Sequence, residues 1–127
     1  MGDFRNLDVW QRAADLSAQT YRLTSRFPFA ERYGLTNQMR RAAVSISSNI
    51  AEGAGRSPAE FRRFLRIARG SLHELHSQLL VAERLEFVAA AEAGELAAHI
   101  ERISRMLLML IRYLSRSRRP GRATPWP

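Results

Sequence analysis

The sequence predicts an all-α protein built as an antiparallel, up-down-up-down four-helix bundle. Apolar residues recur every three or four positions in four separate stretches, which is the period of an amphipathic helix. The breaks between these stretches are short and rich in proline and glycine, and no segment alternates as a β-strand does. Four amphipathic helices with short connections bury their apolar faces most economically as an antiparallel bundle.

The first two helices are expected over residues 8–26 and 35–52. Pro28 ends the first, because proline disfavours the helical conformation in the residue before it. Gly53-Ala54-Gly55 is expected to end the second, with a glycine in the left-handed conformation. The inner face of the first helix is Val9, Ala13, Leu16, Thr20 and Leu23, and that of the second is Leu35, Met39, Ala42, Ala43, Ile46 and Ile50.

The third and fourth helices are expected over residues 58–86 and 90–115. Ser57 fits an N-cap, Pro58 the first helical position and Glu60 the reciprocal partner of a capping box. The third inner face is Phe61, Leu65, Ala68, Leu72, Leu75, Leu79 and Ala82, and the fourth is Leu96, Ile100, Ile103, Leu107, Leu110 and Leu114.

The chain of 127 residues has the size of one domain. We expect residues 1–115 to form the bundle domain and residues 116–127, a basic Pro/Arg-rich tail, to be disordered. The absence of cysteine excludes disulfides and thiolate catalysis, and no N-terminal signal is found. The longest purely apolar run, residues 106–111, is too short to span a membrane. A cytoplasmic protein without membrane contact is therefore expected.

A line of polar side chains follows the second helix beside its apolar stripe. Its members are Gln38, Arg41, Ser45, Asn49 and Glu52, spaced three or four residues apart. As a structural or interface device, this line would hydrogen-bond to the third helix near Ser71 and fix the helix register. As a ligand pocket, it would hold a small polar molecule. The structural interpretation is favoured, because a pocket needs a concavity that the sequence does not show.

The stretch SISSNIAEGAGR resembles the four-helix-bundle proteins of the bacterial 23S rRNA intervening-sequence family. It is preceded by YGLTNQMRRAA and followed by EFRRFLRIARGSLHEL. The resemblance continues in FRNLDVWQRAADL and HSQLLVAERL and covers roughly residues 4–114. It implies a basic, ring-like homopentamer. Relatives include the accessory protein of diversity-generating retroelements, which binds nucleic acid and a reverse transcriptase, so the resemblance implies a reverse transcriptase as a candidate partner.

Self-association is also predicted from the fourth helix. Residues 106–111 are apolar around the whole helix, and such a helix is normally buried on all sides. A second surface should therefore cover Leu108 or Met109. The predicted oligomer interface is Met106, Leu108, Met109 and Ile111.

The formal net charge is +8, and every basic residue other than histidine is arginine. On the third helix Arg62, Arg66, Arg69, His73 and His76 form one basic line, which Arg56 and Arg63 extend. Such a line could follow a phosphate backbone, because guanidinium groups bind phosphate well. The alternative is a solvated helix face with pairs such as Glu60 with Arg63. No aromatic residue lies among these arginines, so base stacking is not expected from this line.

Other chemistry finds no support in the sequence. His73 and His76 share a helix face, but His99 is the only other histidine, so no metal site is predicted. There is no glycine-rich phosphate loop, no convincing carboxylate pair and no base for Ser45, Ser47 or Ser48. We therefore expect no catalytic residues, no cofactor and no enzymatic activity.

The resulting hypothesis is an oligomeric helical protein that binds RNA or DNA through Arg56, Arg62, Arg63, Arg66 and Arg69. The first alternative is a structural or protein-interaction module, for example a reverse-transcriptase accessory, without direct nucleic-acid binding. The second is a binder of a small polar ligand at the Asn49 line.

Overall fold

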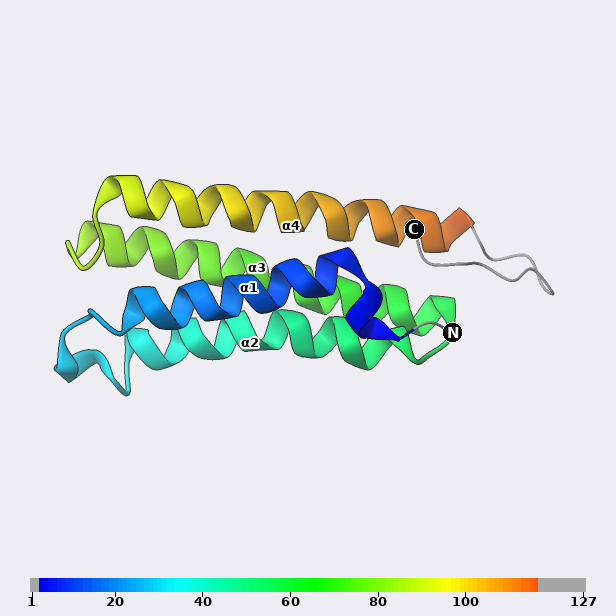
Figure 1. Cartoon of the computed structure of the whole chain (residues 1–127), viewed down its shortest axis with the longest axis horizontal. Helices are drawn as coiled ribbons and strands as arrows, with labels where there is room; N and C mark the ends of the chain where they lie inside the picture. Colours follow the sequence, from blue (N-terminus) through cyan, green and yellow to red (C-terminus); the bar gives the residue numbers. More distant parts are fainter. Residues whose placement is uncertain (1–2, 117–127) are drawn as a thin grey trace.

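The computed structural model describes residues 3–116 as four α-helices without a strand (Figure 1). The α-helices are α1 Asp8–Thr24, α2 Leu35–Ala54, α3 Pro58–Arg84 and α4 Ala90–Arg116. Two short 3-10 turns, η1 Phe4–Asn6 and η2 Phe29–Glu31, precede α1 and α2. The predicted all-α class and the order of four helices are confirmed. The tail expected from residue 116 lies outside the described residues, except Arg116, which ends α4.

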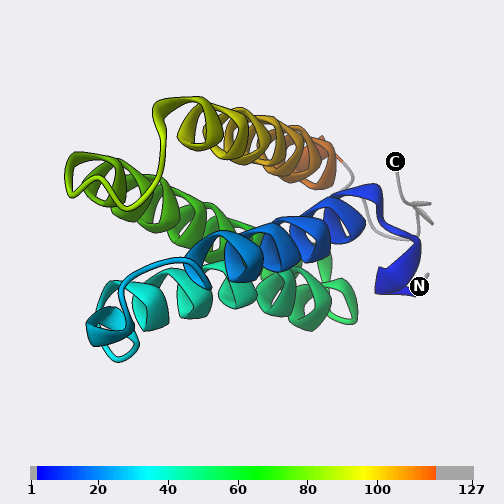
Figure 2. The same ribbon diagram turned by 60° about the vertical axis from the view of Figure 1, so that its left-hand side comes forward.

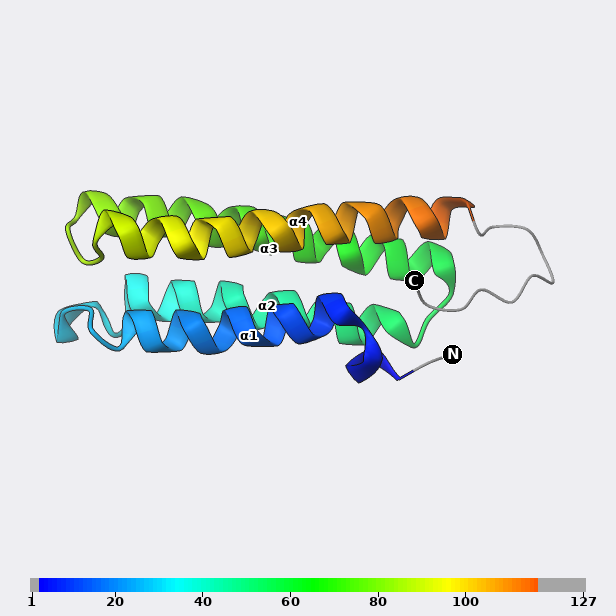
Figure 3. The same cartoon turned by 45° about the horizontal axis from the view of Figure 1, so that its top comes forward.

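The helices lie in two layers, α1 with α2 and α3 with α4 (Figures 2 and 3). The chain turns back after each helix, so the end of α4 and the start of α3 share one end of the molecule (Figure 1). All residues of the inner faces predicted for α1, α3 and α4 are buried, and Leu16, Ile46, Leu72 and Ile103 are completely inaccessible. The inner face predicted for α2 is also buried except for Leu35, which is half-buried. The helical period therefore identified the core correctly.

The end of α2 differs from the sequence prediction. The helix continues to Ala54, and neither Gly53 nor Gly55 adopts the left-handed conformation; Gly55 has φ −90°. Gly53 is buried where α2 meets the start of α3. A Cβ atom there would lie 2.8 Å from Phe61 Cδ1 and 2.8 Å from Phe64 Cβ. Glycine is required at this position because the helices approach closely, and not because of the backbone conformation.

The connection from α3 to α4 begins two residues earlier than the sequence predicts. The N–H of Phe87 donates to the carbonyl of Ala82 and that of Glu86 to Glu83, both at 3.0 Å. This pair of bonds is a Schellman ending. It places Glu86 at φ 64°, the left-handed region that favours glycine. At the other end of α3, the Ser57 hydroxyl accepts the N–H of Glu60 at 3.3 Å, which makes Ser57 the N-cap.

The apolar run in α4 is largely covered by its own bundle. Ile111 is 7% exposed within the single protomer, so it is a core residue and does not require a partner surface. Met106 and Leu108 are half-buried, and Met109 is 67% exposed. The sequence argument for a second surface therefore narrows to Met109 and its immediate neighbours. None of the helices in residues 3–116 is long and apolar enough to cross a membrane.

Candidate nucleic-acid interface

The predicted arginine line lies on α3, along the flank that contacts the end of α4. Arg62 is half-buried, and its Nη1 donates to the Leu114 carbonyl oxygen at 3.1 Å. That carbonyl belongs to the last turn of α4, where helix carbonyls lack intrahelical partners and carry the negative end of the helix dipole. Arg62 therefore links α3 to the last turn of α4.

Arg56 is already paired within the protomer. Its guanidinium contacts Glu52 at 2.5 Å and Glu60 at 3.2 Å, and these hydrogen bonds raise the pKa of Arg56. The group also lies 5.1 Å from the centre of the Phe64 ring. The charge of Arg56 is therefore shared between two carboxylates of its own protomer. Arg56 is thus a poor candidate for phosphate contact.

The remaining arginines of the line differ in their exposure and in whether their guanidinium groups already have partners. Arg63 is exposed and lies 4.8 Å from the centre of the Phe64 ring. An aromatic residue therefore does lie among these arginines, and the sequence prediction on this point is wrong. Arg66 is exposed, and it forms no hydrogen bond or ion pair within residues 3–116. Arg69 is half-buried, and its Nε–H is buried without a partner in the same part of the chain. Arg63 and Arg66 therefore have guanidinium groups that an anion could reach.

The sequence reasoning did not include the arginines of α4, which the fold brings to the same end of the molecule. Residues 58–70 and 102–116 together hold eight arginines and one carboxylate, Glu60, which is paired with Arg56. The intervening residues 71–101 hold six glutamates and one arginine. The layer of α3 and α4 thus has a basic end and an acidic end (Figure 1). The α4 members of the basic end are all exposed: Arg102, Arg105, Arg112 and Arg116.

The polar line on α2 connects to α3 through a chain of hydrogen bonds. Asn49 Nδ2 donates to the carbonyl oxygen of Ser45 at 2.8 Å and to its hydroxyl at 3.0 Å. The hydroxyls of Ser45 and Ser71 are 2.9 Å apart. Glu52 instead pairs with Arg56, and Gln38 and Arg41 are exposed. The line is therefore a helix-to-helix contact at its centre and a free surface at its start.

A polar hollow of about 350 Å³ opens between α2 and α3 beside this line. It is lined by Asn37, Gln38, Arg41, Ala42, Ser45, Glu74 and Gln78. Gln78 Oε1 is buried without a donor within residues 3–116. The hollow is the location that a small polar ligand would use.

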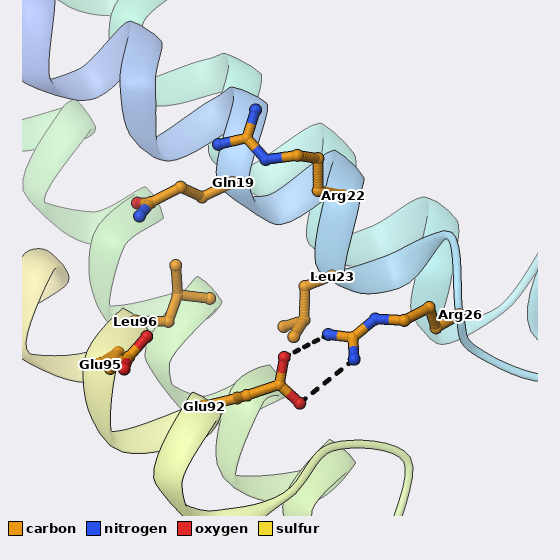
Figure 4. Close-up of a pocket in the computed structure, with 7 residues that line it drawn as sticks. All are labelled: Gln19, Arg22, Leu23, Arg26, Glu92, Glu95 and Leu96. Atoms are coloured by element: carbon orange, nitrogen blue, oxygen red, sulfur yellow. Dashed lines mark hydrogen bonds and ion pairs between the residues drawn. The ribbon is translucent and has the colours of Figure 1, made fainter.

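The seam between α1 and α4 holds a second polar hollow, of about 370 Å³ (Figure 4). Arg26 donates to both carboxylate oxygens of Glu92, at 3.2 and 2.5 Å, and this lowers the pKa of Glu92. Further along the seam, His99 Nδ1 lies 2.5 Å from Gln19 Oε1. Across residues 3–116 no three His, Asp or Glu side chains cluster in a way that could hold a metal ion.

The fold and these surfaces define a helical-bundle protein with one basic end. Comparison with protein families gives the more particular result: residues 5–109 match the family of the 23S rRNA-intervening sequence protein. The chain belongs to this family. The resemblance seen in the sequence is therefore confirmed.

A solved structure supports the fold. It is a protein of unknown function from the S23 ribosomal protein family of Bacteroides thetaiotaomicron. The TM-score is 0.75 at 22% sequence identity, over 82% of this chain and 98% of that one. A comparison with curated proteins finds no match.

Proposed function

We propose that this protein is a non-enzymatic, antiparallel helical bundle that binds nucleic acid with its basic end. The main support for this proposal is that two arginine-rich half-helices lie side by side, residues 58–70 of α3 and 102–116 of α4. Phosphate groups repeat along nucleic acid, and most of the affinity of such a surface comes from neutralising them.

The charged residues of this basic end favour it over the opposite end of the molecule as the surface that binds nucleic acid. Only one carboxylate, Glu60, occurs in the two basic half-helices, and it is already paired with Arg56. Arg66 and Arg105 are exposed, and neither has an ion pair within residues 3–116. Unpaired guanidinium groups keep their full charge for an incoming phosphate, whereas surface ion pairs would have to be broken first.

Assembly into a ring-like homopentamer is part of the proposal. Met109 is the most exposed large apolar residue of α4, and it borders an apolar groove of about 560 Å³ between α1 and α4. Met106 and Leu110 line the same groove, together with Leu7 and Val9 of the α1 side. Several copies of one basic end would bind a single strand with high effective concentration. Light scattering at micromolar protein should therefore give a mass above that of one chain; a monomer mass would contradict assembly.

A matched pair of variants tests the basic end. Arg66→Gln/Arg105→Gln removes two charges there, and Arg22→Gln/Arg84→Gln removes two exposed charges at the other end of the molecule. Both variants lower the net charge equally. Fluorescence anisotropy with labelled RNA should show weaker binding and a salt slope smaller by about 2 only for the first variant. Equal effects of the two variants would show that net charge alone is responsible.

The alternative is a protein-interaction module, for example a partner of a reverse transcriptase. The ion-pair cluster of Arg56 with Glu52 and Glu60 favours it, because a polar, pre-formed cluster suits the rim of a protein interface. This alternative predicts that the parent protein does not bind RNA or DNA even at low salt.

A further inference from the structure

The turn between α1 and α2 carries the most exposed aromatic rings of the described chain. Phe29 is 77% exposed and Tyr33 is 82% exposed. Both lie outside the hydrophobic core cluster, so they do not stabilise the bundle by burial. Large aromatic side chains left in water call for an explanation, because burying each would remove a large apolar area from solvent.

An arginine lies between the two rings. The Arg32 guanidinium carbon is 3.9 Å from the centre of the Phe29 ring and 4.7 Å from that of Tyr33. Its Nη1 also donates to the Phe29 carbonyl oxygen at 3.2 Å, which holds the guanidinium in place. The nearby Glu31 forms no ion pair with Arg32, and its Oε1 accepts the N–H of Leu35 at the start of α2. Two exposed aromatic rings therefore contact the same positively charged guanidinium group.

A second arginine–aromatic pair lies at the same end of the molecule. The Arg40 guanidinium lies 4.5 Å from the centre of the Tyr21 ring, and it is anchored by hydrogen bonds to Thr24 Oγ1 at 2.9 Å and to the Tyr21 carbonyl at 3.3 Å. Tyr21 is 45% exposed. These residues border an open groove of about 470 Å³, lined by Tyr21, Asn37, Arg40, Arg41, Val44, Ser45 and Ser48. Its volume falls in the range of about 300–1,000 Å³ that small ligands occupy.

We propose that this turn binds the unpaired nucleotides of single-stranded RNA or DNA. Phe29 and Tyr33 would stack on exposed bases, Arg32 and Arg41 would contact phosphates, and the groove beside Tyr21 would take the next nucleotide along the strand. Aromatic rings that alternate with fixed cations are how proteins bind single strands without sequence preference. A duplex cannot use the rings, because its bases are already stacked on one another.

The chemistry of the surroundings favours nucleic acid over a protein partner. The turn and its groove hold three arginines, Arg32, Arg40 and Arg41, and one carboxylate, Glu31, whereas Arg22 and Arg26 line the separate hollow between α1 and α4. Aromatic residues and arginine also occur in protein interfaces, so it is the excess of positive charge around the rings that favours a polyanion with exposed bases. The site lies at the opposite end of the molecule from the basic end of α3 and α4 (Figure 1). It therefore adds a preference for single strands that phosphate contacts at the basic end do not supply.

The test measures the full chain by anisotropy with a labelled single strand of about 12 nucleotides and with the same sequence as a duplex. Phe29→Leu/Tyr33→Leu keeps the apolar bulk but removes the stacking faces. We expect it to weaken single-strand binding about tenfold and to leave duplex binding unchanged. The exchange Phe29→Tyr/Tyr33→Phe should bind like the parent, because both rings remain.

A control variant removes exposed apolar surface elsewhere. Leu80→Ala/Val81→Ala changes two residues of α3 that are 50% and 47% exposed, and it should bind like the parent. Single-strand affinity that is unchanged in the Leu variant, or that falls equally for strand and duplex, overturns the proposal. Light scattering on Phe29→Leu/Tyr33→Leu tests whether the rings are also needed for assembly. A loss of assembly would mean that the rings are contacts between protomers, which also overturns it.

Photo-cross-linking gives a second, direct readout. A strand with a photoreactive uracil analogue should label the tryptic peptides 27–32 and 33–40, which carry Phe29 and Tyr33 separately. Labels confined to peptides of α3 and α4 would contradict the site. The failures are distinguishable: if only Arg66→Gln/Arg105→Gln has no effect, the proposed basic end is wrong, and if only the Leu variant has none, the stacking site is wrong. A parent that binds neither strand nor duplex contradicts both.

Discussion

Gly53 provides a sharp test of how α2 and α3 pack, because an alanine there has two opposing effects. In an exposed helical position, Gly→Ala stabilises a helix by about 1 kcal/mol through backbone entropy. At Gly53 the new Cβ would meet Phe61 Cδ1 and Phe64 Cβ at 2.8 Å and the Phe61 Cα at 3.3 Å. The last two atoms belong to or adjoin the backbone of α3, so they cannot rotate away.

The helices would therefore have to move apart. Overpacking of this kind costs about 1–3 kcal/mol. Set against the gain in propensity, Gly53→Ala should destabilise the protein by about 1 kcal/mol. Gly70→Ala is the matched control, since Gly70 lies in the middle of α3 with nothing within 4 Å of its virtual Cβ. It should stabilise by about 1 kcal/mol.

The assay is urea unfolding followed by circular dichroism, at one fixed protein concentration because assembly would shift the apparent stability. The two variants should differ by about 2 kcal/mol, with opposite signs relative to the parent. If Gly53→Ala stabilises the protein as much as Gly70→Ala does, the close approach of α2 and α3 at Gly53 is wrong.

Three further predictions concern single positions. Glu86→Gly should raise the free energy of unfolding by about 1 kcal/mol, because Glu86 has φ 64° and glycine adopts that conformation without strain; an unchanged melting temperature would contradict this. Asn49→Leu should lower stability by about 1 kcal/mol, because the bonds from Asn49 Nδ2 to Ser45 are lost; a melting temperature equal to that of the parent would show that these bonds contribute nothing. Burial, with the charges of Arg12 and Arg102, lowers the pKa of His99, so the unfolded chain takes up a proton first as the pH falls. Stability should therefore decrease as the pH drops below about 6.5, and His99→Gln should reduce that decrease; equal pH profiles would refute the cause.

The sequence predicted the core well because one rule, the helical period, determines it. Every member of the inner faces expected for α1, α3 and α4 is buried. The helix ends were less predictable, because they depend on contacts between helices. Gly53 looked like a helix terminator and is a packing position, and Glu86 adopts a conformation that its residue type disfavours.

The candidate sites required the fold. The arginines of α3 could be read from their spacing, but their α4 neighbours are about forty residues away in the chain. Only the pairing of the two helices, recorded by the bond from Arg62 to Leu114, brings them together. Phe29, Arg32 and Tyr33 are close in the sequence, yet their contact depends on the 3-10 turn η2 and on the hydrogen bond from the Leu35 N–H to Glu31. Periodicity carries no information about such a turn.

The central claim is that the folded bundle itself binds nucleic acid. The three arginines of the tail, Arg118, Arg119 and Arg122, lie outside the described residues and could bind polyanions without the bundle. The most direct measurement is therefore the affinity of a chain ending at Arg116 for labelled RNA over a range of salt concentrations. The account predicts that the shortened chain still binds and that log K falls linearly and steeply with log salt concentration. Loss of binding on removal of the tail, or an affinity that does not change with salt, would contradict it.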